Sequence, residues 1–285
     1  MPKTYNDLYI TARRALRDAG IEAYSLEARL IVAHASGKTM EKLLQNMQFY
    51  TSAEVEDEVS RLTERRLRGE PVAYLTNSWE FYGLPMEVTP DVLIPRTDTE
   101  TLVDVALSLL RGRKMDARIL DLCCGSGCIG CAMALNLPAS RVVMLDISDK
   151  ALRVARHNVN QLGLGSRVLC TDADARKAPP MLVGSFDALL CNPPYIPSGD
   201  ILMLDPSVRD YEPIWALDGG EDGLDFYRDI LKHWKSVLRP GGILLFEVGI
   251  GQSEAVQALM RAAGFLDICA HPDSCGIERV ISGHI

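Results

Sequence analysis

Polar and apolar residues in the first part of the chain alternate with the three- and four-residue spacing that is typical of amphipathic helices. This spacing predicts helices at residues 5–19 and 25–36, and a glycine follows each of them as a stop. Thr51 and Glu54 form a capping-box pattern, which predicts the start of a third helix. Residues 1–71 are therefore expected to form a small helical domain, which either recognises a substrate or serves only as a packing appendage.

The pattern changes at residues 72–96, where short stretches with aromatic residues are interrupted by glycine and proline, and this predicts a β-hairpin linker. Further along, apolar runs of strand length alternate with amphipathic helical segments, which is typical of a mainly parallel sheet with helices on both faces. Strands are expected at residues 118–122, 141–147, 167–171, 186–191, 243–248, 266–270 and 278–282. Gly241 and Gly242 are expected to form the turn into the fifth strand. The fold class is thus α/β, with a seven-stranded Rossmann-like domain at residues 97–285.

Charge and composition narrow the range of functions. The protein carries 38 acidic and 30 basic residues, a net charge of −8, so the whole molecule repels a phosphate backbone unless a local basic patch compensates. No run of about eighteen apolar residues occurs, and the chain does not begin with the pattern of a secretory signal. A soluble cytoplasmic protein is therefore expected, with a monomer as the default.

Three of the eight cysteines have a spacing that also occurs in metal sites. Cys123, Cys128 and Cys131 match the first three ligands of a plant-type iron–sulfur centre, which requires a fourth thiolate. Cys170 and Cys191 are candidates, but each ends an apolar run that predicts a buried strand, where cysteine commonly packs as an apolar residue. We therefore expect reduced thiols and no metal.

A nucleotide-type pocket is predicted where the first strand of the sheet ends. Asp121 lies at that strand end, and Gly125 and Gly127 lie in the turn before the next helix. Glycine allows the backbone to approach a ligand closely, and the helix amino terminus offers unpaired N–H groups. Asp146 ends the next strand, about 20 residues further on, where a carboxylate can accept hydrogen bonds from both ribose hydroxyls. The residues expected to border an adenine after the third strand are Asp172 and Ala173.

Residues 125–130 also match G-x-G-x-x-G, a pattern of dinucleotide-binding folds. A dehydrogenase would place a pyrophosphate on this helix, whereas S-adenosylmethionine has no phosphate but carries a positively charged sulfur and an ammonium group. The carboxylate of Asp121 favours the cationic ligand at close range. The glycine turn by itself leaves both a methyltransferase and an NAD-dependent oxidoreductase open, because the fold supports both.

The segment Asn192-Pro193-Pro194-Tyr195 favours the methyltransferase, because it follows the fourth strand at the sheet edge where ligands bind in such folds. The nitrogen of a planar amide or aromatic amine has a delocalised lone pair, so it needs hydrogen-bond acceptors rather than a strong base. The side-chain oxygen of Asn192 and the carbonyl of Pro193 can each accept one of its N–H groups, and Tyr195 can stack on the planar group. The motif therefore predicts methyl transfer to a planar nitrogen by alignment.

Longer stretches around this motif resemble the HemK-type N5-glutamine methyltransferases of peptide chain release factors. Besides 192–195, the similar stretches are residues 66–75, 80–83, 94–96, 98–100, 208–209, 211–213, 216–220 and 222–224. The resemblance implies an amino-terminal helical domain, a β-hairpin and a seven-stranded S-adenosylmethionine-dependent methyltransferase domain. It implies as substrate and partner the glutamine of the Gly-Gly-Gln loop of a release factor, without indicating which release factor is preferred.

The resemblance also implies roles for particular residues. Asn192, Pro193, Pro194 and Tyr195 would hold the glutamine amide, with Asn192, Pro193 and Tyr195 as the catalytic residues. As cofactor contacts the resemblance implies Cys123, Cys124, Gly125, Ser126, Gly127, Asp146, Ala173 and Asn192, and the strand-end positions described above add Asp121 and Asp172. The residues expected to shape the pocket, to bridge domains or to form plain ion pairs are Arg96, Glu100, Arg209 and Glu247.

The chain departs from the family pattern at three places. Cys123 and Cys124 stand where the family usually has a glycine-containing pair, which predicts a tighter turn. Ala173 stands where a bulkier or aromatic residue is common, which predicts weaker adenine packing. Residues 77–79 replace a stretch that commonly contains glycine.

Other functions remain as alternatives. A DNA adenine-N6 methyltransferase uses the same Asn-Pro-Pro-aromatic chemistry on a flipped base. Such an enzyme needs a basic recognition region, whereas the basic run at residues 61–68 is interrupted by acidic and polar residues. A catalytically silent binding module and an NAD-dependent oxidoreductase both leave residues 192–195 unexplained.

Overall fold

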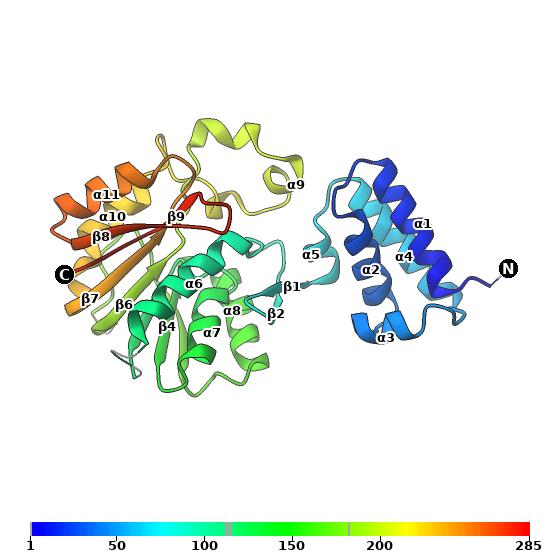
Figure 1. The fold of residues 1–285 in the computed structure, drawn as a ribbon, viewed down its shortest axis with the longest axis horizontal. Helices are drawn as coiled ribbons and strands as arrows, with labels where there is room; N and C mark the ends of the chain where they lie inside the picture. Colours follow the sequence, from blue (N-terminus) through cyan, green and yellow to red (C-terminus); the bar gives the residue numbers. More distant parts are fainter. Residues whose placement is uncertain (1, 112–113, 115, 182) are drawn as a thin grey trace. The chain divides into compact units, whose positions relative to one another are not determined.

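The computed structural model describes residues 2–111, 114, 116–181 and 183–285. The chain forms two compact units (Figure 1). One unit comprises residues 1–78 together with 205–211, and the other comprises residues 79–204 together with 212–285. A short segment that is distant along the chain is thus part of the first, helical unit.

The helical unit is built from the predicted amphipathic segments and from short helices that the pattern did not predict. Its helices are α1 (Tyr5–Asp18), α2 (Tyr24–Ala35), α3 (Met40–Gln45), α4 (Ala53–Leu67), α5 (Val72–Thr76) and α9 (Pro206–Arg209). The side chains of Leu16, Ile31, Leu43 and Leu62 are fully buried in its core. The helices α3, α5 and α9 were missed because so few residues do not establish a helical period.

The start of α4 differs from the predicted one. Ser52, and not Thr51, precedes the helix, and its hydroxyl accepts a hydrogen bond from the amide of Val55 at 3.4 Å. A complete capping box occurs at α1 instead, where the side chains of Thr4 and Asp7 each accept a hydrogen bond from the other's backbone amide. The prediction was wrong by one residue, because serine and threonine are both good caps and adjacent candidates compete.

The predicted β-hairpin is formed by β1 (Ser78–Phe81) and β2 (Leu84–Glu87). Tyr82 and Gly83 make its turn, both with positive φ. The Oε1 atom of Glu100 accepts a hydrogen bond from the backbone amide of Tyr82 at 2.7 Å. Since Glu100 lies in helix α6 (Thr97–Leu110), this bond fastens the hairpin to the rest of the second unit.

The expected seven-stranded sheet is present. Its strands are β3 (Arg118–Leu122), β4 (Arg141–Asp146), β5 (Val168–Asp172), β6 (Phe186–Cys191), β7 (Leu238–Glu247), β8 (Leu266–Pro272) and β9 (Glu278–His284). Their spatial order is β5-β4-β3-β6-β7-β9-β8, and only the pairs of β9 are antiparallel. The structure corrects one detail, because β7 begins before Gly241 and Gly242, which lie inside the strand and do not precede it.

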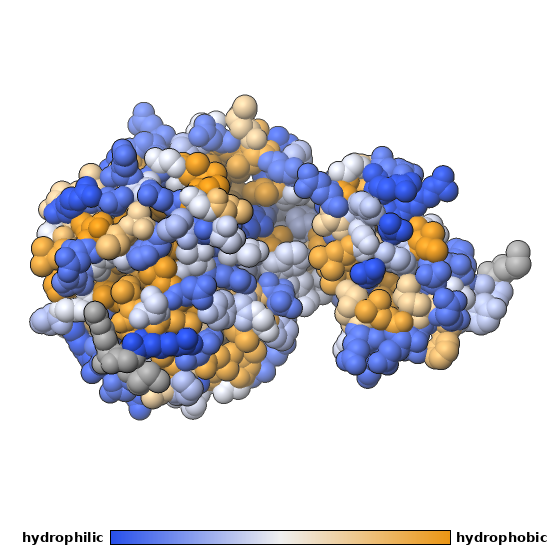
Figure 2. Space-filling model, in the orientation of Figure 1, coloured by the Kyte–Doolittle hydropathy of each residue, from blue (hydrophilic) through white to orange (hydrophobic). Residues whose placement is uncertain are grey.

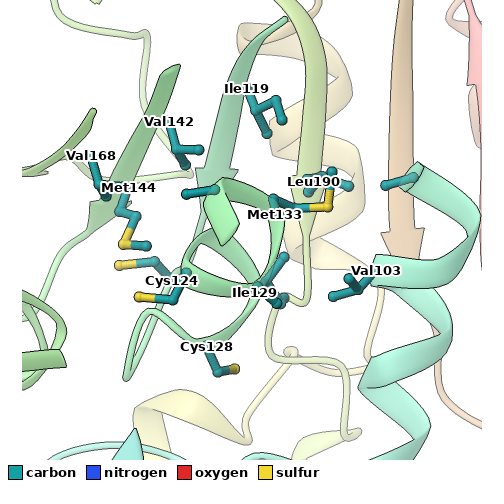
Figure 3. Packing of buried hydrophobic residues seen from close by; sticks show 14 of the residues in the cluster. Val103, Ile119, Cys124, Cys128, Ile129, Met133, Val142, Met144, Val168 and Leu190 are labelled. Carbon is teal, nitrogen blue, oxygen red and sulfur yellow. The ribbon is translucent and has the colours of Figure 1, made fainter. Parts of the chain in front are cut away.

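Helices cover both faces of this sheet. One face carries α6, α7 (Cys128–Asn136) and α8 (Asp149–Gln161), and part of its buried cluster is shown in Figure 3. The other carries α10 (Asp225–His233) and α11 (Ser253–Ala262), packed around Phe186, Tyr227 and Trp234. Short 3-10 helices complete the connections: η1 (Ser198–Met203), η2 (Ile214–Ala216) and η3 (Lys235–Val237). No helix of the described residues is long and apolar enough to cross a membrane.

The strand order positions a ligand site. Strand β3 lies between β4 and β6, so the connections that leave β3 and β6 diverge to opposite sides of the sheet. In open α/β sheets ligands bind in the crevice at the carboxyl ends of the strands at this point. Because Leu122 pairs with Cys191, the glycine turn and the Asn192 segment leave the sheet side by side.

Candidate active site

A cavity of about 270 Å³ lies at these carboxyl ends. Of the residues predicted from the sequence, those that line it are Cys123, Cys124, Gly125, Ser126, Asp146, Ala173, Asn192 and Pro194. The predicted residues that do not line it are Asp121, Gly127, Asp172, Pro193 and Tyr195. Most of the predicted set is thus brought together, although the chain between Asp121 and Tyr195 is long.

The glycine turn keeps a left-handed backbone although its first glycine is replaced. Cys123 has φ 63°, Gly125 has φ 54° and Gly127 has φ 79°. A side chain on Gly127 would lie 3.0 Å from the sulfur of Met144, so this glycine is required for packing as well as for conformation. Cys123 adopts the conformation that a glycine would favour, at some strain.

Asp121 lies beneath this turn and not on the cavity wall. It is fully buried, and its Oδ2 atom accepts a hydrogen bond from the Gly130 amide at 2.9 Å, while Oδ1 has no partner among the described residues. Burial raises its pKa to about 7, and the charge of Asp146 contributes. A Cβ on Gly130 would overlap the end of Met144 and lie 3.0 Å from Asp121. The last glycine of G-x-G-x-x-G therefore serves helix–strand packing here.

Asp146 is the predicted carboxylate that does face the cavity. Its Oδ2 atom accepts a hydrogen bond from the Gly125 amide at 2.9 Å, and Oδ1 accepts one from the Ser148 amide at 2.9 Å. Burial raises its pKa. Within the described part of the chain, no Lys, Arg or His forms an ion pair with Asp121 or Asp146. The arginines on the cavity wall, Arg96 and Arg176, are paired with Glu212 and Asp229, which leaves Asp146 without a paired cation. This arrangement suits a positively charged ligand and disfavours a pyrophosphate, so the site fits S-adenosylmethionine better than NAD.

Replacing Asp146 with alanine is expected to weaken S-adenosylmethionine binding about 10- to 100-fold, because both a ribose acceptor and the brace of the glycine turn are lost. Isothermal titration calorimetry measures the dissociation constant. Asp172→Ala is the matched control, since Asp172 is exposed and lies outside the cavity wall. Equal losses of affinity in both variants would contradict the assignment of Asp146.

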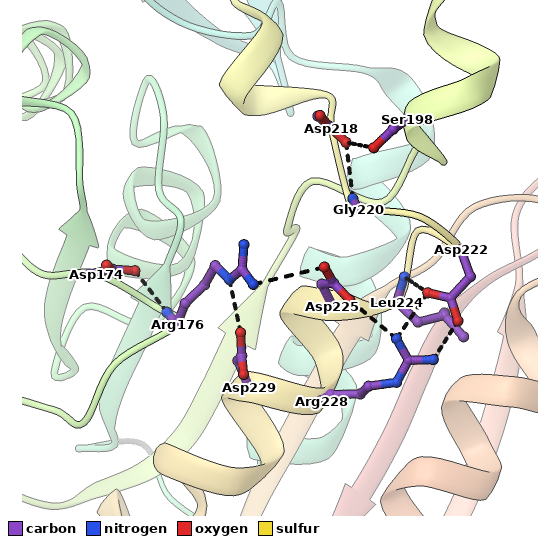
Figure 4. Close-up of polar contacts among 10 residues, drawn as sticks. All are labelled: Asp174, Arg176, Ser198, Asp218, Gly220, Asp222, Leu224, Asp225, Arg228 and Asp229. Carbon is purple, nitrogen blue, oxygen red and sulfur yellow. Dashed lines mark hydrogen bonds and ion pairs between the residues drawn. The ribbon is translucent and has the colours of Figure 1, made fainter.

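Several cavity residues carried no motif and were missed. Asp174, Arg176 and Phe226 line the wall next to Ala173. The guanidinium of Arg176 lies 5.5 Å from the ring centroid of Phe226, and its Nε donates to Asp229 at 2.8 Å (Figure 4). Asp174, and not the predicted Asp172, is therefore the acidic residue of this connection on the cavity wall. Only the fold brings α10 to this place, so no local sequence pattern could have identified Phe226.

The Asn192 segment forms the other wall. The Nδ2 atom of Asn192 donates to the hydroxyl of Thr99 at 3.3 Å. Pro193 and Pro194 are buried, and the Tyr195 hydroxyl donates to Oε1 of Glu247 at 3.5 Å. Because the amide nitrogen of Asn192 is engaged, its Oδ1 atom is the end left to accept a hydrogen bond from a ligand.

Glycines hold the backbone of Tyr195 in place. A Cβ on Gly219 would lie 2.7 Å from Cα of Tyr195, and a Cβ on Gly223 would overlap its carbonyl oxygen. That carbonyl accepts a hydrogen bond from the Gln252 side chain at 2.8 Å. The amide of Gly219 donates to the Ile196 carbonyl at 2.8 Å. The stretches at residues 216–220 and 222–224 are therefore explained as the support of the Asn192–Tyr195 segment, a role that the sequence did not reveal.

Comparisons with known proteins agree with this architecture. The model of the PrmC N-terminal domain matches residues 7–76, and the model of the methyltransferase small domain matches residues 99–202. A release factor glutamine methyltransferase of Geobacter sulfurreducens is 40% identical, over 96% of this chain and 94% of its own. One of Caulobacter vibrioides is 38% identical, over 99% of this chain and 97% of its own. The chain belongs to the release factor glutamine methyltransferase family.

The fold of this methyltransferase recurs in a solved structure of low sequence identity. A crystal structure of a methyltransferase from Pyrococcus furiosus superposes with a TM-score of 0.52 at 18% identity, covering 79% of this chain and 98% of that one. The expected α/β fold class with a helical domain, a hairpin and a seven-stranded sheet is confirmed.

The charged residues singled out in the sequence of this methyltransferase take different positions. Arg96 lines the cavity and pairs with Glu212, whose side chain is 1% exposed and also accepts a hydrogen bond from the Ile94 amide at 3.1 Å. Arg209 pairs with its neighbour Asp210 at 2.7 Å. Glu100 braces the hairpin, as described above, and Glu247 lies behind Tyr195.

The cysteines of this methyltransferase were also considered as metal ligands. No group of three or more His, Cys, Asp or Glu in the described ranges has the arrangement to hold a metal ion. Burial raises the pKa of the Cys128 thiol to about 12 and raises that of Cys131 as well. Both belong to the buried cluster on the α7 face, where Figure 3 shows Cys124 and Cys128 among aliphatic side chains. These thiols pack as apolar residues.

Proposed function

We propose that this protein transfers the methyl group of S-adenosylmethionine to the side-chain nitrogen N5 of the glutamine in the Gly-Gly-Gln loop of peptide chain release factors. The observation that carries the proposal is the hydrogen bond by which Thr99 holds the amide of Asn192 at the cavity wall. The same cavity is lined by Asp146, a carboxylate without an ion-pair partner among the described residues. The relatives named above are release factor glutamine methyltransferases, and a glutamine side chain is a planar amide of the kind that this site suits.

The substrate residues act by alignment. Oδ1 of Asn192 accepts one N–H of the glutamine amide, and the carbonyl of Pro193 accepts the other. Pro193 and Pro194 fix the backbone of this turn and bring no N–H donor of their own. Tyr195 is assigned to stack on the planar group. With both N–H groups held, the nitrogen lone pair is directed toward the methyl carbon. As the N–C bond forms, the S–C bond of the methyl donor would break and S-adenosylhomocysteine would leave. The nitrogen would then release one proton to solvent, so no strong base is needed.

The residues of the cofactor site bind S-adenosylmethionine and orient its methyl group. S-adenosylmethionine, when bound, supplies a methyl group on a positively charged sulfur, which is already an activated donor. Asp146 would accept hydrogen bonds from the ribose hydroxyls, and the turn at residues 123–127 would bring backbone amides close to the ligand. Ala173 and Phe226 line the same wall and would border the adenine, where the ring of Phe226 would compensate for the small side chain of Ala173.

The helical unit offers little to a nucleic acid. Residues 1–78 contain 11 basic and 11 acidic side chains. The basic run of α4 is internally paired: Arg61 with Glu58 at 2.6 Å, Arg65 with Glu70 at 2.5 Å, and Arg66 with Glu27 at 2.6 Å. Arginines that are engaged in this way are poorly available for phosphates. A protein-glutamine substrate is therefore favoured over adenine in DNA.

The surface of the helical unit suits a protein partner. The large hydrophobic side chains exposed on it are Ile10, Leu26, Leu44, Phe49, Tyr50 and Leu67. Figure 2 shows hydrophobic residues among the hydrophilic ones on this unit. A protein partner can bury apolar side chains of this kind. We assign the helical unit, residues 1–71 of the sequence-based division, to release factor recognition by a monomeric cytoplasmic enzyme.

The proposal is tested by incubating the protein with methyl-labelled S-adenosylmethionine and one of three substrates. The substrates are a release factor, the same factor with the loop glutamine changed to alanine, and adenine-containing DNA. Label is expected on the unmodified factor alone, and mass spectrometry of the loop peptide locates it on the glutamine. Label on the DNA, or equal label on the alanine variant, would overturn the proposal.

A further inference from the structure

A buried carboxylate lies behind the Asn192–Tyr195 segment and takes no part in the chemistry described so far. Glu247 is the last residue of β7, and only 2% of it is exposed. Its Oε1 atom accepts the long hydrogen bond from Tyr195, whereas its Oε2 atom has no hydrogen-bond partner among the described residues. Burial raises the pKa of Glu247 to about 7, and a hydrogen bond from Thr99 opposes this shift.

Stability does not explain this arrangement. A buried carboxylate with an unsatisfied oxygen destabilises a fold, and Glu212 shows how the same unit satisfies one, with Arg96 and a backbone amide. The nearby cation, Arg279, forms ion pairs with Asp98 at 2.9 Å and Asp273 at 3.3 Å. Imperfectly satisfied buried groups of this kind concentrate at functional sites.

Thr99 lies next to the Asn192 segment. It is 2% exposed and lies in the first turn of α6. Its hydroxyl accepts the Nδ2 hydrogen bond of Asn192 at 3.3 Å, and the same hydroxyl lowers the pKa of the nearby Glu247 carboxyl. While the hydroxyl accepts from Nδ2, the Oδ1 end of the amide faces away from Thr99 and toward the cavity that both residues line.

The other groups around Glu247 come from several elements. The hydroxyl of Tyr227 in α10 donates to the Glu247 backbone carbonyl at 2.8 Å, so the strand end is fixed independently of the carboxylate. The titratable and charged groups that act on the carboxylate are Asp98, Tyr195 and Arg279, and it in turn acts on Cys128 and Tyr227.

We propose that Thr99 and Glu247 are positioning residues that orient the two substrate-holding side chains. The carboxylate of Glu247 holds the Tyr195 ring at its hydroxyl end, and the Thr99 hydroxyl holds the Asn192 amide so that Oδ1 faces the substrate. This inference rests on the glutamine methyl transfer proposed above. Glu247 lies outside the cavity wall and acts through Tyr195, whereas Thr99 lies on the wall and acts through Asn192.

The first test compares Thr99→Val, which removes the hydroxyl and keeps the shape, with Thr99→Ser, which keeps the hydroxyl. Thr99→Val is expected to lower kcat about tenfold, with the KM for the release factor and the dissociation constant of S-adenosylmethionine changed less than about twofold. Thr99→Ser is expected to retain kcat within about twofold of the wild type. Ser108→Ala is the control on the same helix, since that hydroxyl bonds only its own helix carbonyl, of Val105.

The second test uses the buried carboxylate itself. Because folding raises the pKa of Glu247 from 4.5 to about 7, its contribution to stability falls as pH rises through that interval. Glu247→Met, which removes the carboxylate at similar volume, is therefore expected to unfold at or above the wild-type temperature at pH 8, yet to lose about tenfold in kcat. Glu247→Gln keeps an acceptor and is expected to retain most of kcat. A purely structural role predicts that stability and activity change in the same direction.

A double-mutant cycle closes the test. If Thr99 acts through Asn192, Thr99→Val should cost nothing further in an Asn192→Ala background. Losses in kcat that multiply in the double variant would overturn the positioning role. An unchanged kcat in Thr99→Val and Glu247→Met would do the same. Either result would leave the proposed function intact. A wild-type protein that transfers no methyl group to a release factor would overturn both.

Discussion

Replacing Asn192 with alanine is expected to lower kcat for methyl transfer to a release factor about 100- to 1,000-fold, while the dissociation constant of S-adenosylmethionine changes less than about twofold. The reason is that Oδ1 of Asn192 accepts one of the N–H groups that align a delocalised amide nitrogen. In the wild type the Nδ2 atom donates to Thr99 at 3.3 Å, which leaves Oδ1 as the acceptor for the substrate. Alanine offers no side-chain acceptor in its place. Steady-state kinetics with labelled cofactor and saturating release factor measure kcat, and calorimetry measures the dissociation constant of S-adenosylmethionine.

The control for this prediction is Asn160→Ala, an exposed asparagine on α8. It is expected to leave both constants unchanged. Turnover that survives in Asn192→Ala would show that the acceptor argument is wrong. A large loss of cofactor binding in the same variant would instead assign Asn192 to the cofactor rather than to the glutamine amide.

Gly219→Ala is expected to destabilise the protein by about 2–4 kcal/mol and to reduce kcat by more than about tenfold under conditions where it remains folded. The added Cβ would lie 2.7 Å from Cα of Tyr195 and 2.9 Å from Cα of Gly223, so backbone on both sides must move. Because the moved backbone carries the Asn192–Tyr195 segment, stability and substrate alignment are lost together. Urea denaturation gives the free energy of unfolding, and the release factor assay gives kcat.

Gly199→Ala is the matched control, since it lies in the same connection but no heavy atom lies within 4 Å of its Cβ position. Neither glycine requires a left-handed φ, so the two variants differ in the room available to the methyl group. Equal effects of both substitutions would contradict the role of Gly219 as a support for Tyr195. A Gly219→Ala protein with reduced stability but wild-type kcat would show that Gly219 supports the fold and not the alignment of the substrate.

The sequence by itself determined the long elements and the reaction chemistry. Helices α1, α2 and α4 and all seven strands of the sheet follow from periodicity, because the spacing of apolar residues reflects which face of an element is buried. The chemistry of residues 192–195 also follows, because Asn, Pro and an aromatic ring offer acceptors and a stacking surface wherever they are placed. Short elements such as α3 and α5 were not predicted, because a helix of five or six residues is too short to establish a helical period.

Only the tertiary structure decided which groups meet at the site. Asp121 is the last but one residue of β3 and Asp146 is the last residue of β4, yet only Asp146 faces the cavity, because the Asp121 carboxylate accepts a hydrogen bond from the Gly130 amide of α7 instead. Asp172 and Asp174 are only two residues apart, and the course of the connection selects Asp174 for the cavity wall. Thr99, Asn192 and Glu247 are far apart along the chain, so their hydrogen bonds leave no local pattern. They meet because β6 and β7 are neighbours in the sheet and α6 packs against both.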